Sequence, residues 1–189
     1  MGLLTACSIA IALFPLWQTN PQLGATEIGQ AIADDLKAYT AADGAIVPAD
    51  LIGKPLAKND LATTLSYPSE GFVVLTLTGA QIRRAFERSA LLFPEPNAGF
   101  LQVSGFEVTF SKSAIPNSRV TGVTINGSKL EDARKYEVAM PTSLQKGQLG
   151  YSDLWEQAKV FHSFTNVKMR DVLAGKHSVS SSLRWSVQP

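Results

Sequence analysis

Apolar residues along the first part of the chain switch between helical and strand spacing. Between residues 26 and 37 they recur three to four positions apart, which predicts a helix with Thr26 as its N-cap. Short apolar runs at 45–47 and 72–77 predict buried strands. Prolines and glycine interrupt the pattern between these strands, so we expect a loop there that enters a short helix near Asn59.

The strand at 72–77 leads directly into a second predicted helix. Thr78 and Gln81 occupy the two positions of a capping box, in which each side chain bonds the backbone N–H of the other residue. Pro94 is expected to end this helix. The residues expected on its apolar face are Ile82, Phe86 and Phe93.

The second half of the chain has the pattern of strands. A strand is predicted over 101–110 and another over 119–125, followed by Asn126-Gly127, a hairpin turn signal because both residues tolerate positive φ. We expect the segment 136–140 to return from this turn as the partner of the preceding strand. The remaining predicted elements are a helix over 166–174 and a strand over 183–187.

The composition favours one folded domain. The 189 residues are 45% hydrophobic and 17% charged, which supplies a core and argues against disorder. Lys and Arg number 17 against 16 Asp and Glu, so the chain lacks the basic excess of a nucleic-acid-binding protein. Helix and strand come first and mainly antiparallel strands follow, which predicts an α+β fold with mixed or antiparallel sheets and flanking helices.

The first 25 residues differ from the rest of the chain. They carry no charge, and the apolar run 3–17 is shorter than a membrane span but fits the core of a signal peptide, with cleavage after Ala25. We expect residues 1–25 to be a signal peptide or an N-terminal anchor, with a buried N-terminal element as the alternative. Residues 26–189 are then a domain exported to the periplasm or the cell surface.

Cys7 is the only cysteine of the chain. It ends a lipobox-like pattern, Leu-Thr-Ala-Cys, but the apolar segment follows this pattern instead of preceding it, so an ordinary apolar environment is the favoured interpretation. Without the first 25 residues the chain has no thiol and forms no disulfide.

Three motifs occur in order along the chain: LTGAQ at 77–81, FLQVSG at 100–105 and an Asn-Gly hairpin within 118–141. With the weaker segments of the first helix, they resemble the C-terminal domain of 5′-nucleotidases, the group that includes UDP-sugar hydrolases. The resemblance runs from about Thr26 to Trp185. It implies the fold of that domain, which in the family binds the nucleoside part of the substrate.

The resemblance also implies that the hydrolytic machinery lies elsewhere. In the family, a separate N-terminal metallophosphatase domain holds two metal ions through Asp-x-His, Gly-Asp-x-x and Asn-His-Glu segments, none of which occurs in this sequence. His162 and His177, the only histidines, stand in no such motif and are interpreted as surface residues. We therefore expect no metal, no cofactor and no catalysis by this chain alone.

The family's nucleoside site is expected to be eroded here. The resemblance implies two Phe rings that clamp the base, and their positions correspond to Tyr67, in a shifted register, and to Ser143. The family's Asp that holds the ribose corresponds to Leu149, which cannot accept those hydrogen bonds. The weak candidates for ligand binding in this remnant cleft are Tyr67, Ser143 and Tyr151.

The family's phosphate-binding arginines are also replaced. A loop that carries one of them corresponds to residues 48–53, which contain no Arg, and the other corresponds to Glu27. Without guanidinium groups the bidentate grip on phosphate is lost, and carboxylates nearby would repel an anion.

Other residues with chemical potential have simpler interpretations. The arginines at 83, 84 and 88 are interpreted as a solvated helix face, and Asp34 and Asp35 as surface charges. Three phenylalanines are expected in the core because strand alternation sends them inward: Phe100, Phe106 and Phe110.

Three functions remain open at this point. The first is a stand-alone module that binds a small ligand or a protein partner in the remnant cleft. The second is an accessory part of a nucleotide-hydrolysing system, completing a separately encoded metallophosphatase. The third is a structural subunit of an envelope complex, attached to the membrane only through the N-terminal segment.

Overall fold

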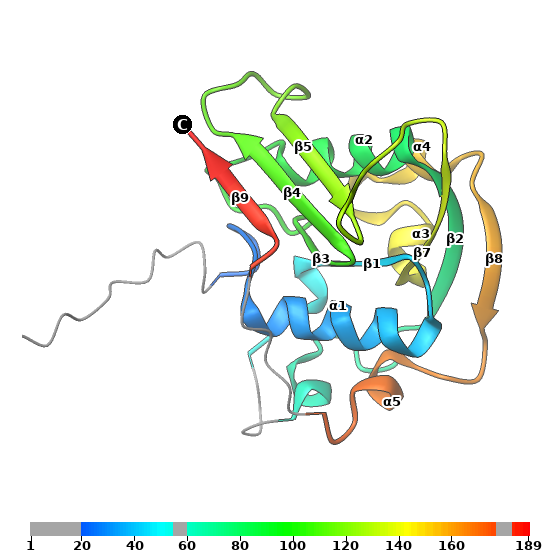
Figure 1. The fold of residues 1–189 in the computed structure, drawn as a ribbon. Helices are drawn as coiled ribbons and strands as arrows, with labels where there is room; N and C mark the ends of the chain where they lie inside the picture. Colours follow the sequence, from blue (N-terminus) through cyan, green and yellow to red (C-terminus); the bar gives the residue numbers. More distant parts are fainter. Residues whose placement is uncertain (1–19, 55–59, 177–182) are drawn as a thin grey trace, which may run out of the picture.

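The computed structural model describes residues 20–54, 60–176 and 183–189, which form two mixed sheets with helices around them (Figure 1). The five-stranded sheet has the order β3-β1-β7-β2-β8 and the four-stranded sheet the order β6-β5-β4-β9. Each sheet contains one parallel pair, β1 with β7 and β4 with β9, and is otherwise antiparallel. The predicted fold class, with mixed sheets and flanking helices, is confirmed.

The elements have the following bounds. The larger sheet consists of β1 (Gly44–Pro48), β2 (Phe72–Thr78), β3 (Leu101–Ser104), β7 (Lys135–Pro141) and β8 (Lys159–Phe164). The smaller sheet consists of β4 (Phe106–Ser111), β5 (Val120–Ile125), β6 (Ser128–Lys129) and β9 (Trp185–Gln188). The α-helices are α1 (Glu27–Thr40), α2 (Gly79–Ala90), α3 (Thr142–Gln145), α4 (Ser152–Trp155) and α5 (Met169–Leu173). Single turns of 3₁₀-helix are η2 (Ala49–Leu51), η3 (Leu61–Thr64) and η4 (Gln148–Gly150).

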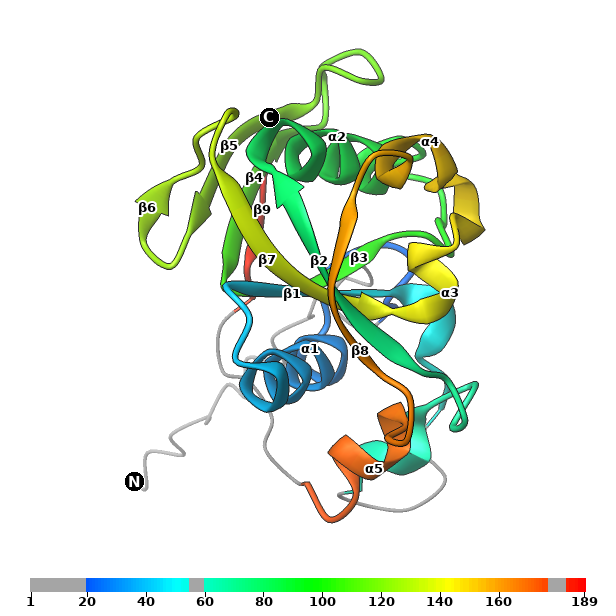
Figure 2. The same cartoon turned by 90° about the vertical axis from the view of Figure 1, so that its right-hand side faces the viewer.

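The two long helices form where the sequence predicts them and lie on opposite sides of the molecule (Figure 2). Thr26 caps α1 by accepting a hydrogen bond from the N–H of Gly29, and the helix runs three residues past its predicted end. The capping box of Thr78 and Gln81 at the start of α2 is present, and α2 ends at Ala90. Phe93, which was expected on the helix, lies in the following turn against Phe110. No helix among the described residues is long and apolar enough to cross a membrane.

The single strand predicted over 101–110 is wrong, because Gly105 divides it between the two sheets. Apolar residues occupy odd positions before Gly105 and even positions after it, a change of phase that one continuous strand does not accommodate. Gly105 has φ of 78°, and a Cβ there would lie 2.5 Å from the carbonyl oxygen of Asp43. Glycine therefore allows both the turn and the close approach of β1.

The Asn126-Gly127 turn is confirmed, with φ of 47° and 79°. Its predicted partner strand is wrong, since the return strand is the two-residue β6, whereas β7 pairs with β2 and β1 in the other sheet. Leu130 explains why the hairpin is so short, because this residue follows β6 directly and its side chain is buried in the core. The chain therefore leaves the hairpin after two residue pairs and crosses to the larger sheet.

An aromatic core joins the two sheets beneath α2, and the predicted burial of all three phenylalanines is confirmed. Its rings meet with centroids 4.7–5.8 Å apart. They belong to Phe86, Phe100, Phe106, Phe110 and Trp185. The indole N–H of Trp185 donates to the carbonyl of Leu101, 2.9 Å away, which ties the predicted closing strand to β3.

Residues 20–25 pack on the domain, although the sequence groups them with the N-terminal segment. The buried side chain of Gln102 donates to the carbonyl of Gly24 and accepts from the N–H of Thr26, at 2.9 and 2.8 Å. The N–H of Asn97 donates to the carbonyl of Gln22. These six residues therefore contribute to the folded domain, and the nature of residues 1–19 stays a prediction.

The remaining predicted elements are present in shorter form. A short helix was expected near Asn59, which lies outside the described residues, and the 3₁₀ turn η3 begins at Leu61. The helix predicted over 166–174 is α5, which covers its last part and precedes Gly175, whose φ is 68°.

Candidate functional site

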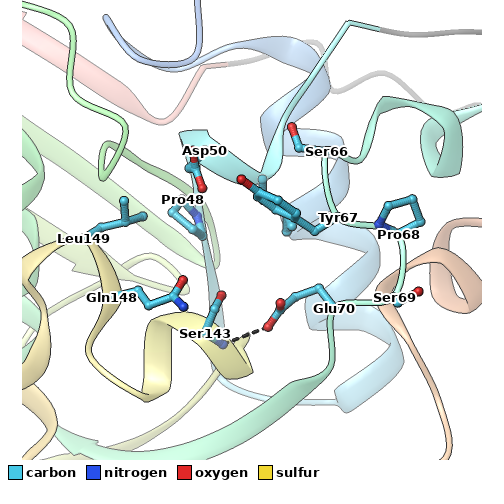
Figure 3. Close-up of a pocket in the computed structure, with 11 residues that line it drawn as sticks. Pro48, Asp50, Ser66, Tyr67, Pro68, Ser69, Glu70, Ser143, Gln148 and Leu149 are labelled. Carbon is cyan, nitrogen blue, oxygen red and sulfur yellow. Dashed lines mark hydrogen bonds between the residues drawn. The ribbon is translucent and has the colours of Figure 1, made fainter.

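A pocket of about 620 Å³ opens where three segments of the chain meet (Figure 3). Its size lies within the range of small-molecule sites, about 300–1,000 Å³. One wall is the end of β1 with η2, the second is the segment before β2, and the third is α3 with η4. We call it the Tyr67 pocket, lined by Pro48, Asp50, Leu51, Ser66, Tyr67, Pro68, Ser69, Glu70, Ser143, Gln148 and Leu149.

Backbone hydrogen bonds attach the Tyr67 segment to the first wall. The N–H of Ser66 donates to the carbonyl of Leu51, and the N–H of Gly53 donates to the carbonyl of Thr64, at 2.9 and 2.7 Å. The Tyr67 side chain remains 54% exposed and borders the cavity. A large aromatic ring is thus held at the pocket by its backbone, with about half of the residue exposed.

Ser143 reaches the pocket because β7 ends at Pro141 and α3 begins at once. The N–H of Ser143 donates to Oε1 of Glu70 at 2.8 Å, and the N–H of Thr142 donates to the carbonyl of Gly71 at 2.9 Å. These bonds join the second and third walls and fix the Glu70 carboxylate at the pocket. The structure therefore brings Tyr67 and Ser143, two of the three candidate residues, to one cavity.

The third wall depends on an unusual loop conformation that Arg88 supports. Leu149 has φ of 60°, a left-handed conformation that costs an ordinary residue about 1–2 kcal/mol. Nη2 of Arg88 donates to the carbonyl of Leu149 at 2.8 Å, and the guanidinium lies so close to Gly150 that a Cβ there would be 2.4 Å from it. Interpreting Arg88 as part of a solvated helix face is wrong, since it is half-buried against this loop.

Tyr151, the third candidate, does not line the pocket. It is fully buried, and its hydroxyl donates to the carbonyl of Gly99 at 2.7 Å. Burial raises the pKa of this hydroxyl, against the opposing influence of the nearby Arg88 charge. Its ring stacks on Trp155, whose indole N–H donates to the carbonyl of Leu144 in α3. Tyr151 thus supports the third wall from behind, a role that the sequence alone does not distinguish from ligand contact.

The pocket presents uncharged polar groups and carboxylates. Its polar groups are the hydroxyls of serine and tyrosine, one amide and the carboxylates of Asp50 and Glu70. No group of three or more His, Cys, Asp or Glu side chains placed to hold a metal ion occurs in the described part of the chain. His162 is exposed on β8 beside Phe164, as expected, and His177 lies outside the described residues.

Comparison with known proteins decides the family. Residues 10–156 match the family model described as 5′-nucleotidase, C-terminal domain. The chain belongs to this family. The match begins within the segment 1–25 and ends before β8, so the domain limits expected from the sequence stay a prediction.

Relatives of this 5′-nucleotidase C-terminal domain are much longer proteins. A 5′-nucleotidase-related protein of Glossina morsitans morsitans is 31% identical over 134 residues, which cover 64% of this chain and 24% of that protein. The snake venom 5′-nucleotidase of Macrovipera lebetinus is 32% identical over 88 residues, 42% of this chain and 22% of that protein. The chain thus spans about a quarter of the length of these relatives.

A solved structure supports the same fold. The 5′-nucleotidase precursor from Thermus thermophilus superposes with a TM-score of 0.78 at 19% identity, over 89% of this chain and 37% of that chain. At this identity the likeness shows the fold alone.

Several charged residues of this domain stabilise the fold away from the pocket. Asp34, interpreted as a surface charge, keeps 34% of its side chain accessible and forms an ion pair of 2.6 Å with Arg184. It also accepts from the hydroxyl of Ser104. On α2, Arg83 binds Asp132 with both Nε and Nη2. Arg84 is exposed, so the solvated-face interpretation holds at this position.

Proposed function

We propose that this 5′-nucleotidase C-terminal domain is a binding module whose Tyr67 pocket holds a small ligand. The observation that carries the proposal is the meeting of Tyr67 and Ser143 in one cavity, because the resemblance places the family's two base-clamping positions there. A single ring, a serine in place of the second ring and Leu149 in place of the ribose-binding Asp support a ligand other than the family's nucleoside.

We also propose that the chain alone does not hydrolyse nucleotides. This proposal is supported by the sequence, in which the metal-binding segments of the family's phosphatase domain do not occur. A two-metal site needs several oxygen and imidazole ligands around the reacting phosphate. The expected role of these residues is to bind, and any cleavage of a phosphate ester would require groups that this sequence does not supply.

The proposal is tested by two measurements on the full chain. Incubation with AMP, UMP and added Mg²⁺, Mn²⁺ or Zn²⁺ should release no phosphate above a metal-only control. Release that is proportional to protein and persists after a second purification would contradict the proposal. Calorimetric titration with adenosine and uridine should give no heat at millimolar ligand, since one ring and the ribose-binding carboxylate are replaced.

A second candidate is an accessory role beside a separately encoded metallophosphatase. It is favoured by the names of the relatives, a 5′-nucleotidase-related protein and a snake venom 5′-nucleotidase. This role requires nucleoside affinity, so saturable binding of adenosine or uridine at the Tyr67 pocket would favour it over the first candidate.

We further propose that the protein is exported. The uncharged apolar segment near the N-terminus supports this, and the relative from Thermus thermophilus is described as a precursor. Fractionation of cells that express the full chain, followed by mass spectrometry of its N-terminus, tests the proposal. Recovery of an intact chain in the cytosolic fraction would contradict it.

A further inference from the structure

The Tyr67 pocket is negatively charged. Asp50 enters it from η2 and Glu70 from the segment before β2. No Lys or Arg lines the pocket, and neither carboxylate forms an ion pair, as far as residues 20–54, 60–176 and 183–189 are concerned. Two carboxylates without a balancing cation create a field that attracts positive ligands and repels anions.

The aromatic ring of the pocket adds a second attraction for positive charge. Tyr67 is 54% exposed and borders the same cavity as the two carboxylates (Figure 3). The face of a tyrosine ring is electron-rich and attracts ammonium groups within about 6 Å of its centre. An exposed ring between carboxylates is therefore a surface on which an organic cation is stabilised from several sides.

The other polar groups suit the body of such a ligand. The N–H of Ser143 holds Oε1 of Glu70 at 2.8 Å, so this carboxylate is oriented before a ligand arrives. The pocket also presents the amide of Gln148 and the hydroxyls of three serines, which donate and accept hydrogen bonds without charge. A ligand with hydroxyl groups beside its charged group would find partners for both.

We propose that the Tyr67 pocket binds a small organic cation, an ammonium group on a body that carries hydroxyl groups. This inference rests on the proposed binding function and names the class of its ligand. It separates this pocket from the phosphate recognition implied by the resemblance, because a phosphate in the same place would meet two like charges. The pocket selects by charge first and by hydrogen bonding second.

Two series of compounds with matched bodies test the inference on the full chain. Glucosamine, glucose and glucuronate share a sugar ring and differ in charge, and tyramine, tyrosol and 4-hydroxyphenylacetate share a phenol. Titrations followed by the NMR shifts of the pocket amides should show each cation binding about tenfold more tightly than its neutral analogue. The anions should not shift these amides, and 1 M NaCl should reduce the preference because it screens charges beyond about 3 Å.

A double variant assigns the preference to the pocket. Asp50→Asn with Glu70→Gln removes both charges, while the amide oxygen introduced at position 70 can still accept from the Ser143 N–H. The preference for cations should then fall to the smaller part that the Tyr67 ring alone supplies. The matched control is Glu95→Gln with Glu156→Gln, which changes the net charge by the same amount at exposed positions outside the pocket. This control should keep the preference of the unaltered chain.

The outcomes separate this inference from the proposed function. A neutral compound or an anion that binds the pocket as well as its cation would overturn the charge inference and leave the binding function standing. If none of the six compounds shifts the pocket amides at millimolar concentration, the inference fails. The binding function fails as well only if a broader set of compounds also leaves the pocket unoccupied.

Discussion

Asp34 and Asp35 are neighbours on α1, and each carboxylate faces a cation, but their hydrogen bonding differs. Asp34 is paired with Arg184 at 2.6 Å, whereas Asp35 lies 4.0 Å from Lys176 and its Oδ2 is buried without a hydrogen-bond partner among the described residues. Burial raises the pKa of Asp35 above its usual value, with Lys176 opposing and Asp34 adding to the effect. The ion pair and hydrogen bond of Asp34 therefore favour the folded state, whereas the burial of the Asp35 charge disfavours it.

Asp35→Asn is expected to stabilise the protein at neutral pH. Because the pKa of Asp35 is raised in the folded state, the native protein holds this proton more tightly, and stability falls as pH rises above the usual value of 3.8. The substitution removes this cost, so the thermal midpoint at pH 7 should rise by a few degrees, where 1 kcal/mol corresponds to about 2–4 °C. The difference should shrink as the pH approaches 3.8.

Asp34→Asn is the matched control, with the opposite sign. It removes the charge that binds Arg184 and the strong acceptor for Ser104, and should cost about 1–3 kcal/mol at pH 7. Thermal melts of both variants from pH 4 to pH 8 provide the comparison. A lower thermal midpoint for Asp35→Asn than for the unaltered chain at pH 7 would show that the charge of Asp35 stabilises the folded protein.

At the residue scale the sequence predicts burial better than it predicts roles. Phenylalanines that alternate along a strand are core residues, and Phe100, Phe106 and Phe110 follow this rule. Tyr67 and Tyr151 look alike in sequence, yet one is 54% exposed at the pocket and the other is fully buried. Their difference depends on contacts made by distant segments, which no local pattern contains. Ligand binding by Tyr67 and Ser143 stays a prediction.

At the scale of elements, Gly105 decides that one apolar stretch becomes two strands. Its φ of 78° turns the chain from the larger sheet into the smaller one, and the approach of the Asp43 carbonyl leaves no room for a side chain. The apolar positions change from odd to even numbers at this glycine, so the sequence does contain a sign of the boundary, which the prediction of a single strand does not use. The pairing of β7 is not predicted for another reason: its partners β1 and β2 lie far away in sequence, and no local pattern indicates them.

Gly105→Ala is expected to destabilise the protein more than Gly127→Ala. Both glycines have φ near 80°, so alanine costs about 1–2 kcal/mol at either position. At Gly127 a Cβ meets nothing within 4 Å, whereas at Gly105 it lies 2.5 Å from the Asp43 oxygen. Overpacking should add about 1–3 kcal/mol there, measured by urea unfolding. Equal losses of unfolding free energy at the two positions would mean that the backbone around Gly105 moves away from the added Cβ without cost.

At the scale of the whole molecule, Gln102 joins the residues before α1 to the larger sheet. Its buried side chain bonds backbone groups of Pro21, Gly24 and Thr26, which lie more than 75 positions away in sequence. The FLQVSG motif contains this glutamine, but the sequence indicates only that it belongs to a strand. Its partners are known only once the fold is complete.

Gln102→Leu should cost about 2–4 kcal/mol in unfolding free energy, because it leaves several buried backbone groups without partners. The amide of Thr26 should also exchange with solvent faster than in the unaltered chain. Gln157→Leu makes the same chemical change at an exposed position and should alter stability by no more than about 0.5 kcal/mol. Similar unfolding curves for the two variants would show that Gln102 does not fix this segment.

The most direct test of the account is to map where small molecules bind on the full, isotope-labelled chain by NMR, using a library of small polar compounds that includes amines, sugars and nucleosides. We expect the compounds that bind to shift the amides of Tyr67, Glu70, Ser143 and Leu149, and Ser143→Trp to abolish these shifts by filling the cavity. Compounds that bind only at other surfaces, or a library without any binder, would contradict the claim that this domain is a module built around the Tyr67 pocket.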